Sequence, residues 1–515
     1  MAGECVNDVL RLPSKRWLVL FLVAIGLQFL GILNSDLGLD THVRLNAMSD
    51  VSKEGHDLAW GPLRLSDSST QGSGNTAVYD GYIPPWNTSP LAFQLTAAVS
   101  LGVVALLAAV GPKDDSGRVT LVPAYALVVL LSPVFLFATS RGYDEAILAL
   151  FGGVALVGFA FDDSPSVHRL RLHVVWMATS LLPIMAWKGF PLLMAFGVWL
   201  GALVLGMGWV AWHQHASARS ETPLTSHPWV MAALASTGCL LVMVLLSLGA
   251  QSGTFAIVFD EPLKFLLALF FAVFDAVGLY LLVGLALWPL IHEKRSSLLN
   301  VRSPELSLLT MYISGLLTAI IFYIAALWSL ESTIWQRPMT ETMVVLGNNG
   351  RYATCLVLPI LMVLKWPRSE GEPSNRWPQH LTAALAILVP FILLTSLMGH
   401  QLWSEDAGAA AADVWQDDED QFLLIAPETL AMHHLYVMKT HLDLDGTLGI
   451  QGHWRTEDTA STFLIDATPD LIVLAPHVTY TLDPLAYELV DESSVPVTVP
   501  GGIQSGGWQL YRSLT

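Results

Sequence analysis

Two carboxylates stand just beyond the first long apolar run of the chain, in the stretch Asn34–Met48. Asp36 and Asp40 lie within seven residues of the end of the run Trp17–Leu33. Charges beside hydrocarbon cost several kcal/mol unless they are paired or hydrated. Two interpretations follow from the residues. Asp40 is a catalytic carboxylate, or this stretch is a solvated loop that caps a following helix.

Further ionisable residues stand at the ends of other apolar runs. His42 and Arg44 follow Asp40; the others are Arg141, Asp144 and Glu145 between the third and fourth runs, Lys188 between the fifth and sixth, and Arg351 and Tyr352 before the tenth. We expect these residues to share one side of a membrane and to form a polar cavity there. The alternative is that Arg141 pairs with Asp40 or Asp144 only to hold helices together, and that Lys188 reaches from a hairpin to the interface.

The composition is typical of a membrane protein. Of the 515 residues, 53% are hydrophobic and only 13% are charged, whereas soluble domains have roughly 25% charged residues. The three cysteines, Cys5, Cys239 and Cys355, do not form a disulfide framework. The formal net charge of -18 argues against nucleic acid as a partner.

Apolar runs of spanning length recur along residues 1–398, and no cleavable signal peptide precedes them. They are Trp17–Leu33, Pro90–Val110, Val119–Ala138, Glu145–Phe161, Leu172–Trp187, Phe190–Trp212, Trp229–Gly249, Pro262–Ile291, Leu306–Leu330, Tyr352–Trp366 and His380–Met398. The sequence therefore predicts an α-helical polytopic membrane protein with about eleven spans.

The distribution of Lys and Arg predicts the orientation. With a cytoplasmic N-terminus, fourteen basic residues fall in inside segments and eight in outside loops, as the positive-inside rule requires. An odd number of spans then places the long loop Asn34–Ser89 and everything after Met398 outside the cell. We expect the protein to be integral to the plasma membrane.

The tail, residues 399–515, is predicted to be a small, acidic, soluble α/β domain outside the membrane. It holds 18 Asp and Glu residues against three Lys and Arg. Short apolar runs, at Phe422–Ala426, Thr462–Ile465 and Leu471–Ala475, alternate with one helical stretch, Pro427–His441. The three histidines on or near that stretch, His433, His434 and His441, are expected at the surface, because no third well-placed ligand completes a zinc site.

The layout and several short motifs resemble the GT-C glycosyltransferases, multi-span enzymes that use polyprenyl-phosphate-linked sugars. The matching strings are Gly38–Arg44, Asn87–Leu91, Ser140–Glu145 and Gly350–Tyr352, the last of which precedes Pro359. The residue after Asp40 is Thr41 and not a second acid. This departure from the commonest family pattern leaves open whether Asp40 or Asp36 is the catalytic carboxylate, and we prefer Asp40.

The resemblance implies a hexosyl transfer from a polyprenyl-phosphate donor to an acceptor hydroxyl on a glycan, a lipid or a protein. A phosphate leaving group needs no acid and only compensation of its charge. Arg351 is the first candidate for that role, followed by Arg141 and Lys188. The residues expected around the substrates are His42, Arg44, Asp144, Glu145 and Tyr352, where Asp144 and Glu145 either orient the acceptor or hold a divalent cation. No other cofactor is implied.

Two other functions fit the same sequence. One is a transporter or flippase for lipid-linked sugars, and the other is a non-catalytic subunit with the GT-C fold. Transporters tend to show internal repeats and polar residues at mid-membrane depth. The chain shows no clear repeat, and its polar groups gather at one face, which favours the enzyme.

The predicted topology can be tested by cysteine labelling. Cysteines introduced at Ser69 and Ser461 should both react with an impermeant thiol reagent in intact cells, because both positions lie outside in the eleven-span topology. Labelling of only one of the two would contradict that topology and the shared outer face.

Overall fold

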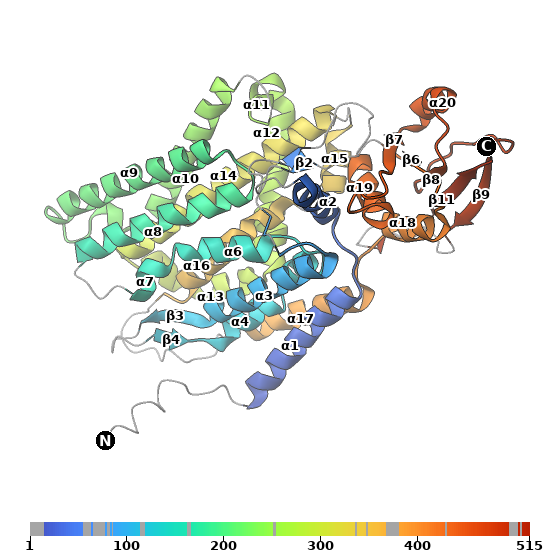
Figure 1. Cartoon of the computed structure of the whole chain (residues 1–515). Helices are drawn as coiled ribbons and strands as arrows, with labels where there is room; N and C mark the ends of the chain where they lie inside the picture. Colours follow the sequence, from blue (N-terminus) through green and yellow to red (C-terminus); the bar gives the residue numbers. More distant parts are fainter. Residues whose placement is uncertain are drawn as a thin grey trace.

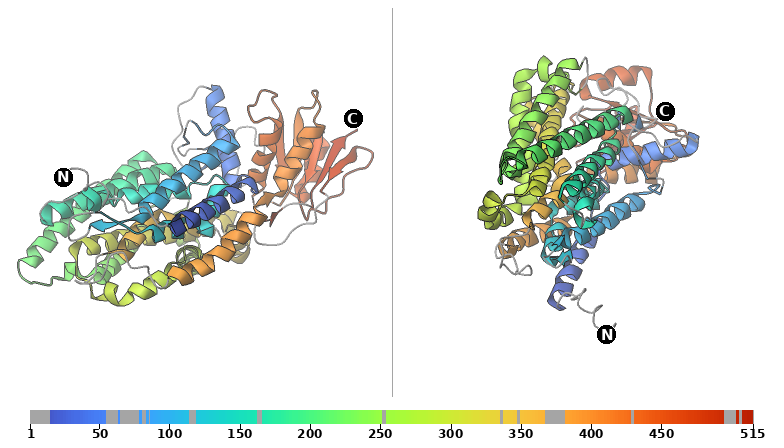
Figure 2. Two further views of the ribbon diagram at one scale, coloured as in Figure 1. Left: turned by 90° about the horizontal axis from the view of Figure 1, so that it is seen from below. Right: turned by 90° about the vertical axis from the view of Figure 1, so that its left-hand side faces the viewer.

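The computed structural model consists of a bundle of helices with a small α/β domain at one end (Figures 1 and 2). It describes residues 15–54, 63–64, 78–79, 83–84, 86–113, 119–161, 166–250, 254–334, 337–346, 349–366, 381–427, 430–493, 503–504 and 507–514. Position 69 of the topology test and much of the predicted outer loop lie outside these ranges.

The helices follow in chain order. They are α1 (Lys15–Leu33), α2 (Leu39–Glu54), α3 (Pro90–Ala109), α4 (Pro123–Leu130), α5 (Pro133–Ser140), α6 (Glu145–Val154), α7 (Val157–Phe161), α8 (Ser166–Trp187), α9 (Leu192–Ser217), α10 (Pro228–Gly249), α11 (Ile257–Asp260), α12 (Pro262–Val273), α13 (Leu287–Asn300), α14 (Pro304–Ile334), α15 (Met339–Leu346), α16 (Val357–Leu364), α17 (Leu381–Met398), α18 (Trp403–Val414), α19 (Ala431–Leu442) and α20 (Glu457–Asp466). The 3-10 helices η1 (Leu224–Ser226) and η3 (Asn349–Leu356) and the π-helix η2 (Phe274–Gly284) complete them.

The strands are short and most of them lie in the tail. They are β1 (Leu63–Arg64), β2 (Val78–Tyr79), β3 (Val110–Lys113), β4 (Val119–Leu121), β5 (Gln401–Leu402), β6 (Gln421–Ile425), β7 (Gln451–Arg455), β8 (Leu471–Leu474), β9 (Tyr487–Glu492), β10 (Ile503–Gln504) and β11 (Gln509–Ser513).

The described helices identify an integral membrane protein. Six of them are long and apolar enough to cross a membrane, and the bent pair α4 and α5 can be counted as a seventh. Four shorter apolar helices, at Leu18–Leu33, Glu145–Val154, Asn349–Leu364 and Thr382–Met398, fall where the sequence predicts the remaining spans. The number of eleven spans and the orientation remain predictions.

Proline decides where several of these helices begin and break. Six of the described helices begin with proline, at a position where the missing N–H group is not needed. Pro133 divides the predicted span Val119–Ala138 into α4 and α5, whose axes are bent by 55° relative to each other. The predicted single span Pro262–Ile291 is likewise divided: it passes from α12 into η2, and α13 begins at Leu287.

The segment that carries Arg351 packs closely on α6. A Cβ atom at Gly152 of α6 would lie 1.7 Å from the carbonyl oxygen of Cys355 in η3, so only glycine permits this approach. The contact brings the N-terminal end of α6, where Asp144 and Glu145 stand, beside η3. It therefore fixes two acids and a cation relative to one another.

The tail is an α/β domain, as predicted. Its five-stranded sheet has the order β7-β6-β8-β11-β9, in which β6 is parallel to β7 and β8, and β11 is antiparallel to β8 and β9. Side chains of β6 and β8 pack on α18 and α19 from one face and on α20 from the other.

Two details of the predicted tail are wrong. Thr462–Ile465 belongs to α20, where Ala460 and Phe463 supply the contacts to the sheet, and is therefore not a separate short run of the sheet. The helical stretch begins at Ala431 and not at Pro427. The proposed boundary at residue 399 stays a prediction, although α17 ends at Met398 and Gly399 takes a left-handed φ of +65°.

The chain after the first apolar run is not simply a loop. Leu39–Glu54 forms α2, which lies between the helical bundle and the tail domain (Figure 1, dark blue). Helix α2 packs on α19 of the tail, and Val43, Leu45 and Ala47 join the same buried cluster as Leu435 and Met438. The residues that follow Asp40 are therefore held by the tail.

Candidate active site

The centre of the polar region is the buried guanidinium of Arg351, which lies between two carboxylates. Its Nη2 atom is 2.9 Å from Oδ2 of Asp40, and its Nε atom is 2.8 Å from Oε1 of Glu145. The ring of Tyr143 lies against the guanidinium, with 4.3 Å from its centroid to Cζ. Residues from α2, the start of α6 and η3 thus meet at one point.

Asp40 is paired with Arg351, and part of its side chain is exposed to solvent. Its side chain is 40% exposed, whereas those of Arg351 and Glu145 are 6% and 1% exposed. Burial alone would raise the pKa of the Asp40 carboxyl, but the hydrogen bond from His433 and the positive charge of Arg351 outweigh this effect and hold the pKa well below its usual range. Asp40 is therefore ionised at neutral pH and can be reached by a small molecule.

Arg44 and Asp144 form a second ion pair nearby. The Nη1 atom of Arg44 is 2.7 Å from Oδ1 of Asp144, and its guanidinium lies 5.1 Å from the centroid of the Phe93 ring. Because Asp40 and Asp144 pair with Arg351 and Arg44, the interpretation that Arg141 holds helices together by pairing with either acid is wrong.

Arg141 and Lys188 form no close ion pair among the described residues, and both lie against aromatic rings. The Arg141 guanidinium lies 3.7 Å from the centroid of Phe137, and Nζ of Lys188 lies 4.1 Å from the centroid of Tyr352. Burial lowers the pKa of Arg141 to about 10 and lowers that of Lys188. The negative charges of Glu145, Asp144 and Asp40 attract Lys188 and oppose the effect of burial.

Asp36 lies apart from this cluster. Its Oδ2 atom accepts a hydrogen bond of 2.7 Å from the backbone N–H of Leu402, and its own N–H donates to the carbonyl of His400. Burial raises the pKa of Asp36 to about 6. The geometry gives Asp36 a structural task, which is to join the end of α1 to the first strand of the tail.

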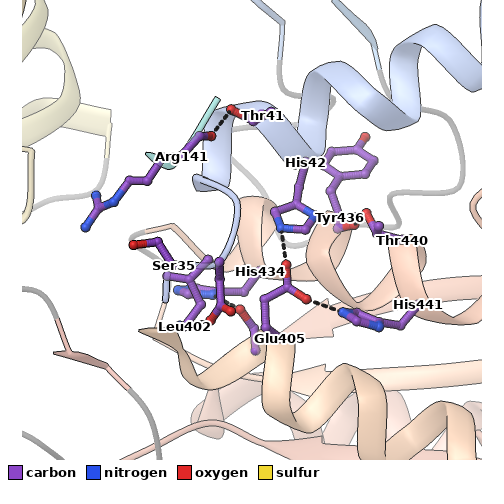
Figure 3. Close-up of polar contacts among 12 residues, drawn as sticks. Ser35, Thr41, His42, Arg141, Leu402, Glu405, His434, Tyr436, Thr440 and His441 are labelled. Atoms are coloured by element: carbon purple, nitrogen blue, oxygen red, sulfur yellow. Dashed lines mark hydrogen bonds and ion pairs between the residues drawn. The ribbon is translucent and has the colours of Figure 1, made fainter. Parts of the chain in front are cut away.

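His42 points toward the tail and not toward Arg351. Its Nε2 atom is 2.7 Å from Oε1 of Glu405, and its Nδ1 atom is 3.0 Å from Oγ1 of Thr440. Figure 3 shows Glu405 between His42 and His441, which contacts the other carboxylate oxygen. His42 therefore lies in the interface between α2 and the tail, and its expected contact with the substrates stays a prediction.

The expectation that the tail histidines lie at the surface is wrong for two of them. His433 and His434 are buried. Nδ1 of His434 is 2.8 Å from Oγ of Ser404, and burial lowers the pKa of His434 to about 3. The sequence did carry a signal of this burial. Most other positions of the helix are apolar, so protein surrounds the helix and its polar residues are buried as well.

The acids do not form a metal site. Asp144 and Glu145 each face an arginine, and no group of three or more His, Cys, Asp or Glu side chains in the described part of the chain could hold an ion. The arrangement does not fit the divalent cation that the resemblance allowed at these two acids.

Asp275, to which the sequence assigned no role, supports the backbone beside Arg351. Its Oδ2 atom accepts a hydrogen bond of 2.7 Å from the N–H of Gly350. A Cβ atom at position 350 would lie 2.7 Å from that oxygen and 2.5 Å from the ring of Tyr280. Because it has no side chain, Gly350 allows η3 to pack directly against η2.

Comparison with known proteins gives matches only at the level of structure. No family model and no curated protein matches the sequence. The crystal structure of ArnT from Cupriavidus metallidurans bound to undecaprenyl phosphate is similar over 97% of this chain and 98% of that chain, with 13% identity and a TM-score of 0.38. The apo structure of the same protein is similar over 96% and 98%, with 13% identity and a TM-score of 0.34. At these scores the functional argument rests on the geometry of the site.

The contact of Glu405 with two histidines predicts a pH-dependent attachment of the tail. Burial opposes ionisation of Glu405, but hydrogen bonds from His42 and His441 lower its pKa from 4.5 to about 2. A carboxyl whose pKa is lowered by folding stabilises the folded state above pH 4.5 and loses this contribution as the pH falls toward 2. In hydrogen exchange, corrected for intrinsic rates, the amides of α2 and α19 should lose protection in that range.

Glu405→Gln should show the same loss of protection already at pH 7. Hydrogen bonds to a charged group contribute about 1.5–3 kcal/mol, which corresponds to roughly 10- to 100-fold faster exchange where opening is local. Glu488→Gln, at an exposed position of β9, is the control. Equal protection of α2 and α19 in both variants would show that Glu405 does not hold the tail.

Proposed function

We propose that the protein is a membrane glycosyltransferase that moves a sugar from a polyprenyl-phosphate donor to an acceptor hydroxyl on the extracytoplasmic side. One observation carries the proposal: an accessible, ionised carboxylate, Asp40, is fixed by a buried arginine near two basic side chains, Arg141 and Lys188, that form no close ion pair among the described residues. Such a set can accept a proton and stabilise a departing anion at one place. It stands at the end of a bundle of apolar helices, where a lipid carrier would present its phosphate.

Asp40 is the general base in this mechanism. An acceptor hydroxyl has a pKa far above neutrality, so it needs a base within hydrogen-bond reach as it attacks the anomeric carbon. Arg351 occupies Oδ2 of Asp40, and the proton passes to Oδ1. The new bond joins the acceptor oxygen to the anomeric carbon, the bond from that carbon to the phosphate oxygen breaks, and the polyprenyl phosphate leaves.

Arg141 and Lys188 are the better candidates for the leaving phosphate. Arg351 was the first choice from the sequence, but two carboxylates already compensate its charge. A phosphate near hydrocarbon requires cations whose charge is not already neutralised. Arg351 then acts on the base, and the pair formed by Arg44 and Asp144 shapes the site beside it. Tyr352 contributes the ring under Lys188.

A glycosidase mechanism fits these contacts less well. It requires a second carboxyl group as general acid. The two carboxylates at the start of α6, Asp144 and Glu145, both face arginines. Neither stands free to protonate a leaving group.

A transporter for lipid-linked sugars is the second candidate, and one observation favours it. Transporters place polar residues on interrupted helices inside the membrane, and Asp275 is a buried acid in the π-helix η2. Its carboxylate, however, accepts the N–H of Gly350, which ties it to the segment that holds Arg351.

Asp40→Asn tests the enzyme directly. Asparagine keeps the shape of the side chain but cannot take the proton, so transfer from a radiolabelled polyprenyl-phosphate hexose to a crude acceptor extract should fall at least about 100-fold. Donor binding by the purified, folded protein should persist. Asp36→Asn is the matched control and should be much milder, because the amide oxygen can still accept the N–H of Leu402.

Full transfer by Asp40→Asn would exclude Asp40 as the base. Loss of transfer in Asp36→Asn alone would assign the reaction to the other carboxylate. Parent protein that moves lipid-linked sugars across a vesicle membrane without transferring them would favour the transporter.

Variants of the cations distinguish the site of the phosphate. Arg141→Ala and Lys188→Ala should each weaken binding of sugar-free polyprenyl phosphate, by on the order of 2–4 kcal/mol if the contact is desolvated. Arg351→Ala should chiefly lower the rate of transfer, and Arg351→Lys should restore it only in part, because a point charge replaces a planar fork. Arg337→Ala, which removes an exposed pair with Glu341, is the control. Loss of lipid binding in Arg351→Ala alone would place the phosphate on Arg351.

A further inference from the structure

The tail domain contributes a side chain to the base itself. Nε2 of His433, in α19, lies 3.4 Å from Oδ1 of Asp40, while Arg351 holds Oδ2. The His433 side chain is 11% exposed. The two oxygens of the carboxylate therefore face different groups, one from the membrane domain and one from the tail.

The packing of α19 fixes where His433 stands. The amide nitrogen of Asn46 in α2 donates to the carbonyl of Tyr436, at 3.1 Å, and to Oγ1 of Thr440, at 3.0 Å. Asn46 stands six residues after Asp40, and its partners Tyr436 and Thr440 stand three and seven residues after His433. The register between α2 and α19 is thus set by buried hydrogen bonds that are remote from the reacting groups.

The neighbouring histidine prevents rotation of α19. Nδ1 of His434 contacts the hydroxyl of Ser404, and its ring lies 4.6 Å from that of Trp403, centroid to centroid. With His434 anchored on α18, the adjacent side chain of His433 is directed toward α2. The contact between His433 and Asp40 is therefore constrained along the axis of α19 by Asn46 and around that axis by His434.

We propose that His433 is a positioning residue for the general base, so that the active centre is shared between the membrane domain and the tail. This inference rests on the proposed function of Asp40. Arg351 alone leaves the carboxylate able to rotate about its own axis and exchange its oxygens. His433 contacts Oδ1 at 3.4 Å and so opposes this rotation, while the second lone pair of that oxygen can still accept the proton.

A positioning role affects the rate and not the binding of substrates. A misplacement of about 1 Å in a reacting group can cost about 100-fold in rate. In the full-length protein, His433→Ala should lower kcat by roughly 10- to 100-fold and change KM for donor and acceptor by less than about twofold. His433→Gln should restore most of the rate, because its amide N–H can reach the same oxygen.

The control is His477→Asn, since His477 is an exposed tail residue whose φ of +69° asparagine tolerates. It should keep the parent kcat. A folded His433→Ala variant with the parent kcat would overturn the inference. A loss of activity that is due entirely to a higher KM would also overturn it.

A double variant separates this inference from the proposed function. If His433 acts through Asp40, His433→Ala should have no further effect on the residual rate of Asp40→Asn, and the two substitutions should shift the thermal unfolding midpoint non-additively. If the parent protein transfers no sugar, the proposed function is wrong. The unfolding midpoints of the parent, the two single variants and the double variant still show whether Asp40 and His433 interact. Additive shifts would overturn the positioning role.

Discussion

A guanidinium removed from water needs compensation from every direction, and this requirement organises the centre of the molecule. Removing one member of a buried ion pair leaves an uncompensated charge, at a cost of several kcal/mol. Arg351 meets the requirement with one acid from α2 and one from the start of α6. The close approach of η3 at Gly152 and the support of Gly350 by Asp275 follow from the same need, because they place the arginine where both carboxylates can reach it.

The remaining cations are held in a different way. Arg141 lies over Phe137 and Lys188 over Tyr352, so aromatic rings and not carboxylates provide their contacts. A ring attracts a cation through its quadrupole and leaves the net charge unchanged. The site therefore contains one arginine held by two carboxylates and two basic side chains held against aromatic rings. This division explains how so many ionisable groups coexist near apolar helices.

The sequence located the parts of the site but not their pairing. The order of the apolar runs predicted Asp40, Glu145 and Arg351 on the same side of the membrane, and these residues do meet. Which acid pairs with which arginine could not be read, because Arg44 and Asp144 are 100 residues apart and Asp40 and Arg351 are 311 apart. Composition gives no information about such distant partners.

Elements that pack on two surfaces were the hardest to predict. Helix α2 has almost no hydrophobic periodicity, since it carries polar groups toward both the bundle and the tail, so it resembles a loop in the sequence. The histidines of α19 were misplaced for the related reason that their partners, Asp40 and Ser404, come from other parts of the chain. The break between α4 and α5 has a local cause, Pro133. The apolar run that contains it is as long as an ordinary span, so a single span was predicted.

The long separation between Asp40 and its partners has a consequence during biosynthesis. The carboxylate is made near the beginning of translation, whereas Arg351 follows 311 residues later and His433 later still. Since domains emerge in order from the N-terminus, Asp40 stays without its native counter-charges through most of chain elongation. The full set of contacts to this carboxylate can therefore form only after the tail domain has left the ribosome and docked on α2.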